Sequence, residues 1–108
     1  MVYARPDYLQ GTGGDTARRF LRALFASVGQ ILDTPAADHT AMLKKLYGGV
    51  PDDVLLETFE NTKRIYSRDG IVTPASVQKA GVFMVESGAV KTPATFEQVA
   101  DNGFLPKR

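Results

Sequence analysis

Residues 15–33 read DTARRFLRALFASVGQILD, and this stretch decides the class of fold. Its apolar residues recur at intervals of three and four positions: Ala17, Phe20, Leu21, Leu24, Phe25, Val28, Ile31 and Leu32. That spacing is typical of an α-helix with one buried stripe. Asp15 or Thr16 can accept hydrogen bonds from the N–H groups of a first turn, so we expect the helix to begin there. The stripe predicts a core helix that needs a large partner surface.

The residues before this helix predict a short lead-in. Residues 2–4 have modest strand propensity and predict either a short edge strand or an extended segment. Residues 5–10 can close one helical turn, because Pro6 suits a first helical position. Gly11-Thr12-Gly13-Gly14 predicts a hinge-like connector rather than a phosphate-binding loop, since no Lys-Ser/Thr pair follows the glycines. We therefore divide the chain into a lead-in with a Gly-rich hinge, residues 1–14, and a helical domain, residues 15–108.

Two further helices are predicted in the middle of the chain. The first begins at Thr34-Pro35, a capping residue followed by proline, and ends at Gly48-Gly49 in the left-handed conformation that glycine tolerates. The second begins at Pro51, with Asp52 and Asp53 at the positive end of its dipole. Its expected inner stripe consists of Val54, Leu55, Phe59, Thr62, Ile65 and Tyr66.

Two more helices complete the predicted fold. Thr73-Pro74 begins one that runs to about Ser87, with Gly88 just past its end. Its expected inner side consists of Val77, Ala80, Gly81, Met84 and Val85, with Gly81 allowing close helix approach. Thr95 and Gln98 have the spacing of a capping box and predict a short last helix. The fold class is therefore mainly α, with four to five helices and a short N-terminal strand or extended segment.

Composition limits the function classes. A chain of 108 residues forms one domain at most, or a piece of one, and the absence of cysteine excludes disulfides and thiolate metal sites. The 13 Lys and Arg residues nearly balance the 12 Asp and Glu residues, which argues against a nucleic-acid partner. The longest apolar run, residues 81–85, is far too short to span a bilayer. Residues 1–10 lack the basic-then-apolar pattern of a signal peptide.

No residue pattern predicts catalysis, a metal or a cofactor. His39 is the only histidine, and no cluster with ligand spacing surrounds it, so we expect a solvated helix residue. None of the serines lies in a nucleophile-elbow sequence; those considered are Ser27, Ser67, Ser76 and Ser87. Glu57 and Glu60 are explained by a solvated helix face. We therefore predict a protein that is not an enzyme and assign no catalytic, metal-binding or ligand-binding residue.

The basic residues predict solvated helix faces. Arg18, Arg19 and Arg22 open the first long helix, and Lys44-Lys45 and Lys63-Arg64 lie near the ends of later ones. Three arginines at the start of a helix oppose its dipole, so we expect them to have acidic partners elsewhere. Because aromatic residues are not interleaved with them, they do not predict a nucleic-acid site.

An ordered series of short motifs runs through the chain. It consists of Arg18-Arg19-Phe20-Leu21-Arg22-Ala23-Leu24, the helix begun at Pro35, Tyr47-Gly48-Gly49-Val50-Pro51, Gly70-Ile71-Val72 before Thr73-Pro74, Val85-Glu86-Ser87-Gly88-Ala89-Val90, and residues 96–105, FEQVADNGFL. Together, residues 15–105 resemble the C-terminal part of bacterial ABC-transporter solute-binding proteins of the nitrate, sulfonate, taurine and thiamine-precursor group. The Gly11–Gly14 loop departs from the Asn-Pro-type lead usual in that group.

The resemblance implies a two-lobed α/β binding protein that closes on a small solute and delivers it to an ABC permease. Members are exported to the periplasm or tethered outside the membrane. Their final helices mostly brace the lobes, and their ligand contacts come from earlier segments. We therefore expect either part of a longer solute-binding protein or a free-standing helical interaction module. Helices that cover a lobe expose apolar surface when isolated, so we also expect homo-oligomers, formed for example by exchange across the Gly11–Gly14 hinge.

Overall fold

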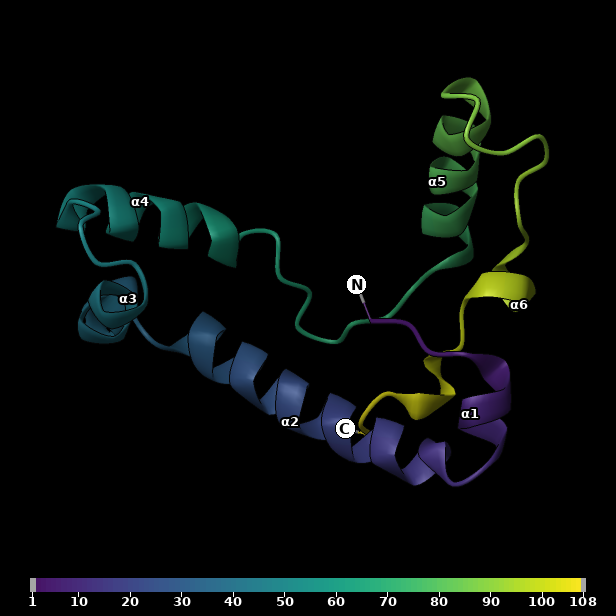
Figure 1. The fold of residues 1–108 in the computed structure, drawn as a ribbon, viewed down its shortest axis with the longest axis horizontal. Coiled ribbons are helices and arrows are strands. Elements are labelled where there is room, and N and C mark those ends of the chain that lie inside the picture. Colours follow the sequence, from purple (N-terminus) through teal and green to yellow (C-terminus); the bar gives the residue numbers. More distant parts are fainter. Residues whose placement is uncertain (1, 108) are drawn as a thin grey trace. The chain divides into compact units, whose positions relative to one another are not determined.

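The computed structural model of the chain describes residues 2–107 and is mainly α-helical, which confirms the predicted class. Figure 1 shows the order of the elements along the chain. They are α1 (Pro6–Gln10), α2 (Gly13–Asp33), the 3-10 helix η1 (Ala36–His39), α3 (Thr40–Leu46), α4 (Asp52–Lys63), α5 (Pro74–Glu86), α6 (Phe96–Val99) and the 3-10 helix η2 (Asn102–Phe104). No strand occurs within residues 2–107, so the predicted edge strand at residues 2–4 is not formed; residues 2–5 have no regular secondary structure, and Arg5 has extended backbone angles.

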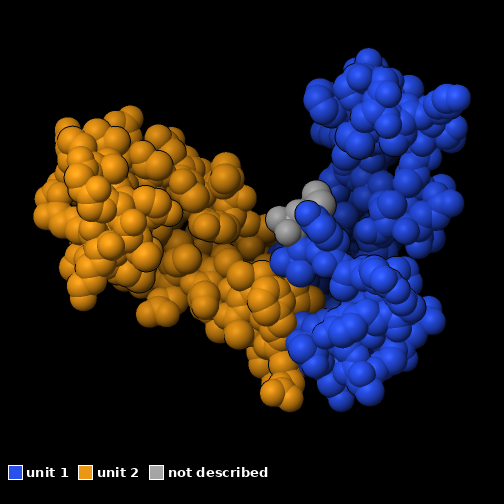
Figure 2. Space-filling model, viewed as in Figure 1, with its two compact units in different colours: residues 1–18, 70–108 blue, residues 19–69 orange. Residues whose placement is uncertain are grey.

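The described chain divides into two compact units (Figure 2). Unit 1 combines the start of the chain, up to Arg18, with the part that follows Asp69. Unit 2 consists of residues 19–69. The division therefore falls within α2 and after Asp69.

The predicted hinge at Gly11–Gly14 is wrong for its second half. Helix α2 begins at Gly13, two residues before the predicted start, and both Gly13 and Gly14 are buried. A Cβ atom on Gly13 would lie 2.5 Å from the Tyr8 ring, and one on Gly14 would lie 2.7 Å from the Leu9 carbonyl oxygen. The two glycines therefore permit close contact between α1 and the start of α2, and only Gly11 and Thr12 form a turn.

Unit 2 has a small apolar core. Helix α3, helix α4 and η1 contact one another. Each element of the unit contributes one buried apolar side chain: Val28 from α2, Ala36 from η1, Leu43 from α3 and Leu55 from α4. These are the only buried apolar side chains within residues 2–107.

The long stripe of α2 is less buried than its periodicity predicts. Val28 is buried, most of the other stripe residues are half-buried, and Phe20 is 54% exposed. Helix α2 crosses the division between the two units: residues 13–18 belong to unit 1, so unit 2 contains only residues 19–33 of the helix.

Two predicted helix boundaries in unit 2 are wrong. Thr34 does not cap a helix, because its N–H donates to the Gln30 carbonyl and continues the pattern of α2. Pro35 is extended and precedes η1, so α3 begins only at Thr40. Helix α4 ends at Lys63, and the following N–H groups bond three residues back in a tighter turn. Ile65 and Tyr66 therefore leave the predicted stripe, and Ile65 is 81% exposed.

The predicted signals at the ends of α5 and α6 in unit 1 are confirmed. At the start of α5, the Ser76 N–H donates to Thr73 Oγ1 and the Thr73 N–H donates to Ser76 Oγ, both at 3.1 Å. At its end, Gly88 has a φ of 74°, and the Ala89 N–H donates to the Met84 carbonyl at 2.9 Å. At α6, the Thr95 N–H donates to Gln98 Oε1 at 2.9 Å.

The predicted inner side of α5 is only partly covered. No residue of α5 is buried, and of its predicted inner side only Gly81 and Val77 are half-buried. A Cβ atom on Gly81 would lie 2.8 Å from Pro93 Cβ. The absence of a side chain at Gly81 therefore allows close contact with the segment before α6, and not with a second helix as predicted.

The core of unit 2 can be tested by comparing two leucines of α3. Leu43 is 7% exposed and Leu46 is 67% exposed. We expect Leu43→Ala to lower the free energy of unfolding by about 2–5 kcal/mol, because it leaves a cavity. Leu46→Ala should change it by no more than about 0.5 kcal/mol. Urea unfolding followed by circular dichroism measures both, and equal losses would contradict the assigned core.

Candidate interaction surface

His39 is less solvated than predicted. It ends η1, and its ring centroid lies 5.1 Å from that of Phe59 in α4. Its Nε2 atom is buried and has no hydrogen-bond partner. No group of three or more His, Cys, Asp or Glu side chains within residues 2–107 has an arrangement that could hold a metal ion. The contacts of His39 are therefore those of a packing residue.

The candidate serines bond locally. Ser27 Oγ donates to the Ala23 carbonyl at 3.0 Å, and Ser87 Oγ donates to the Met84 carbonyl at 3.1 Å. Ser76 belongs to the cap of α5, and Ser67 Oγ bonds Asp69 at 3.0 Å. These bonds hold helix turns and helix ends, which is the usual role of serine hydroxyls in helical proteins.

Some basic residues have specific contacts and are not simply solvated. The Arg18 guanidinium lies 4.5 Å from the ring centroid of Phe104, a cation–π contact within unit 1 and not the predicted acidic partner. In unit 2, Lys44 Nζ forms an ion pair with Asp52 at 2.7 Å. Asp52 therefore faces a basic residue of α3 in addition to lying in the first turn of α4.

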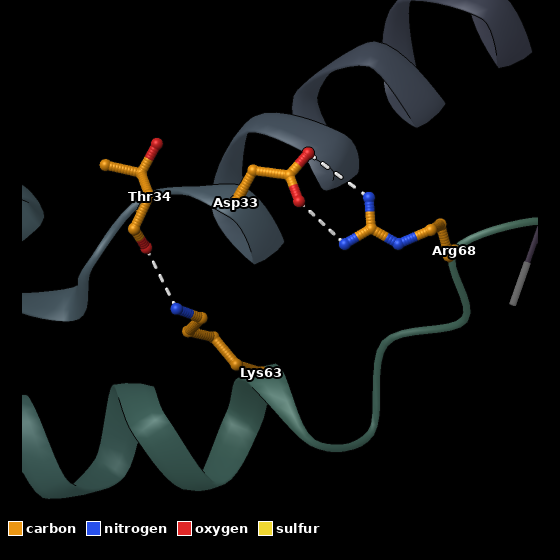
Figure 3. A network of polar contacts seen from close by, with 4 residues as sticks. All are labelled: Asp33, Thr34, Lys63 and Arg68. Atoms are coloured by element: carbon orange, nitrogen blue, oxygen red, sulfur yellow. Dashed lines mark hydrogen bonds and ion pairs between the residues drawn. The ribbon is translucent and has the colours of Figure 1, made fainter.

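A polar network joins the ends of α2 and α4 in unit 2 (Figure 3). Lys63 Nζ donates to the Thr34 carbonyl at 2.9 Å. The Arg68 guanidinium donates to both carboxylate oxygens of Asp33, at 2.8 and 3.2 Å. The periodicity places Asp33 on the outer face of α2, but the pairing was missed because 35 residues separate it from Arg68.

In unit 1, Val72 and Asn102 form a polar contact that the sequence did not predict. The Val72 N–H donates to Asn102 Oδ1 at 3.0 Å, and Asn102 Nδ2 donates to the Val72 carbonyl at 2.8 Å. One side chain thus satisfies both backbone groups of a residue in an extended segment. The local sequence gives no signal for this pairing, because 30 residues separate the two partners.

A candidate interaction surface lies on the exposed side of α5 in unit 1. Its centre carries Val82, which is 50% exposed, and Phe83, which is 68% exposed. Lys79 and Glu86, the only charged residues of α5, lie on the same side. At 3.6 residues per turn these four positions fall within an arc of about 100°. We call this set, Lys79, Val82, Phe83 and Glu86, the α5 outer face.

The opposite side of α5 contacts the rest of unit 1. Val77, Gly81 and Met84 lie roughly 180° from the outer face on a regular helix. Gly81 is the position against which Pro93 packs, and Val77 is half-buried. The α5 outer face therefore lies on the side of the helix opposite the contact between Gly81 and Pro93.

Comparisons with protein-family models, with curated proteins and with solved structures found no match. Within residues 2–107 no helix combines the length and the apolar character that a membrane crossing requires.

The contribution of the Asp33–Arg68 pair to folding stability is expected to depend on pH. The hydrogen bond from the Arg68 guanidinium lowers the pKa of the Asp33 carboxyl. The pair therefore contributes stability above the unfolded pKa of about 3.9, and this contribution is lost as the pH falls through the lower folded pKa. Carbon-13 titration by NMR should show a higher Asp33 pKa in Arg68→Gln. Arg64→Gln removes the same charge nearby and is the control; an equal rise there would contradict the pairing.

Proposed function

We propose that the chain is the helical C-terminal portion of a non-catalytic solute-binding protein of an ABC importer. The solute is a small organic or anionic molecule of the nitrate, sulfonate, taurine or thiamine-precursor type. Segments outside these 108 residues supply the ligand contacts, and the complete protein delivers the solute to a permease in the periplasm or cell envelope. The ordered series of motifs between Arg18 and Leu105 supports this proposal.

The observation that carries the proposal is the uncovered apolar surface of α5. Residues 81–85 are five consecutive apolar residues, so they reach all sides of the helix. A helix that is hydrophobic all round normally lies inside a larger body. Within residues 2–18 and 70–107 of unit 1 no apolar side chain is buried, and Val82, Phe83, Met84 and Val85 are all exposed. An α/β lobe of the kind found in solute-binding proteins would cover the exposed apolar residues of α5 that lie outside the α5 outer face, Met84 and Val85.

The alternative is a free-standing helical module for self-association or protein interaction. The α5 outer face favours it, because opposite charges flank an exposed apolar centre. Exposed apolar patches with a polar rim mark interaction sites. The two proposals differ in the size of the natural gene product.

The first experiment is to measure the mass of the endogenous product in its native cells, by immunoblot and intact mass spectrometry. We expect a species much larger than 11.7 kDa, because the uncovered helices require further chain to pack on. A native product that begins at Met1 and has this mass would contradict the solute-binding proposal and support the interaction module.

Ligand binding gives a second prediction. A solute stabilises a protein only if it prefers the folded form. The isolated 108-residue chain should therefore show no thermal shift with nitrate, taurine, alkanesulfonates or pyrimidines, whereas the larger endogenous species should shift by several degrees with one of them. A shift in the isolated chain would place the ligand site within these residues. No shift in the larger species with any of the four would contradict the proposed solute class.

A further inference from the structure

We propose that the α5 outer face is a self-association surface that docks antiparallel on the same face of a second copy of this chain. The inference goes beyond solute binding and does not depend on it. It rests on the exposure of Val82 and Phe83 and on the positions of the two charged residues of α5.

The charges of α5 are self-complementary in an antiparallel pair. Lys79 and Glu86 are seven residues apart, and the midpoint between them lies between Val82 and Phe83. A twofold axis through that midpoint places Lys79 of each copy opposite Glu86 of the other. The two residues do not pair within one helix, because seven residues separate them by about 10 Å along the axis. A second copy therefore supplies a partner for each charge.

The apolar centre supplies the attraction. The same axis places Phe83 of each copy opposite Val82 of the other. These are the two most exposed large apolar side chains of α5, and both lie on the side opposite Gly81 and Pro93. On a helix that only faced water, this side would be polar. Docking removes both side chains of both copies from water.

The charges also select the orientation. A parallel pair in the same register would place Lys79 beside Lys79 and Glu86 beside Glu86, and like charges at such distances are destabilising. The position of Glu86 has no local explanation, because an acidic residue in the last turn opposes the helix dipole. Pairing with Lys79 of a second copy provides one.

The size of the surface sets the expected strength. A contact along one 13-residue helix is small beside the roughly 1,600 Å² of a standard protein interface. We therefore expect reversible association that depends on concentration, with an apparent mass that rises from 11.7 kDa toward twice that value.

Charge exchange tests the proposal. Sedimentation equilibrium of the 108-residue chain should detect the dimer. Lys79→Glu and Glu86→Lys should each weaken it by roughly tenfold, because each creates two like-charge contacts per dimer. An equimolar mixture of the two variants should restore association as a heterodimer, and so should the double variant. Lys91→Glu changes the same charge in unit 1 outside α5 and should leave association unchanged.

Glu86→Lys places a charge that agrees better with the helix dipole, and Lys79 is an exposed residue in the middle of α5, so neither variant should unfold the helix. Circular dichroism at equal concentration checks this. A chain that stays monomeric at several hundred micromolar would overturn the proposal. Association that both single variants leave unchanged would also overturn it, and would assign the contact to another apolar surface. Recovery in the mixture, with neither variant associating alone, would establish the antiparallel register.

Discussion

The apolar faces of these helices need to be covered, and the chain itself covers few of them. Among residues 2–107 four side chains are buried, all in unit 2, and each comes from a different element: Val28, Ala36, Leu43 and Leu55. Burial of apolar surface is the main favourable contribution to folding, so a set of helices with so little of it depends on additional surface. We propose two kinds of additional surface: an α/β lobe for most of these faces, and a second copy of the chain for the α5 outer face alone.

Hydrogen bonds and charged side chains fix the positions of segments that apolar contacts do not fix. In unit 2, Lys63 and Arg68 bind the end of α2 through the Thr34 carbonyl and the Asp33 carboxylate. In unit 1, Asn102 binds both backbone groups of Val72, and Arg18 lies over Phe104. The exposed pair of Asp33 and Arg68 contributes little free energy, because water screens it. The pair instead favours one conformation of the chain between Asp33 and Arg68 over others.

The two sides of helix α5 differ: one contacts the rest of unit 1 and the other is exposed. Gly81 admits Pro93 on one side, while Val82 and Phe83 remain exposed on the other. Its caps form from residues near in sequence, so α5 has clear ends whether or not either side is covered. A helix defined locally in this way can present an apolar face to a partner.

The sequence by itself determined the helical class, the cap of α5 at Thr73 and Ser76, its end at Gly88 and the capping bond of α6, because these depend on residues a few positions apart. It did not determine the start of α2 at Gly13, the 3-10 turn before α3 or the end of α4, where packing against Tyr8 and tighter hydrogen bonding decide. Only the tertiary structure paired Asp33 with Arg68 and Val72 with Asn102, since partners 30 or more residues apart leave no periodic signal. Periodicity also identified the apolar stripe of α2, but how much of it is buried depends on the surfaces that reach it.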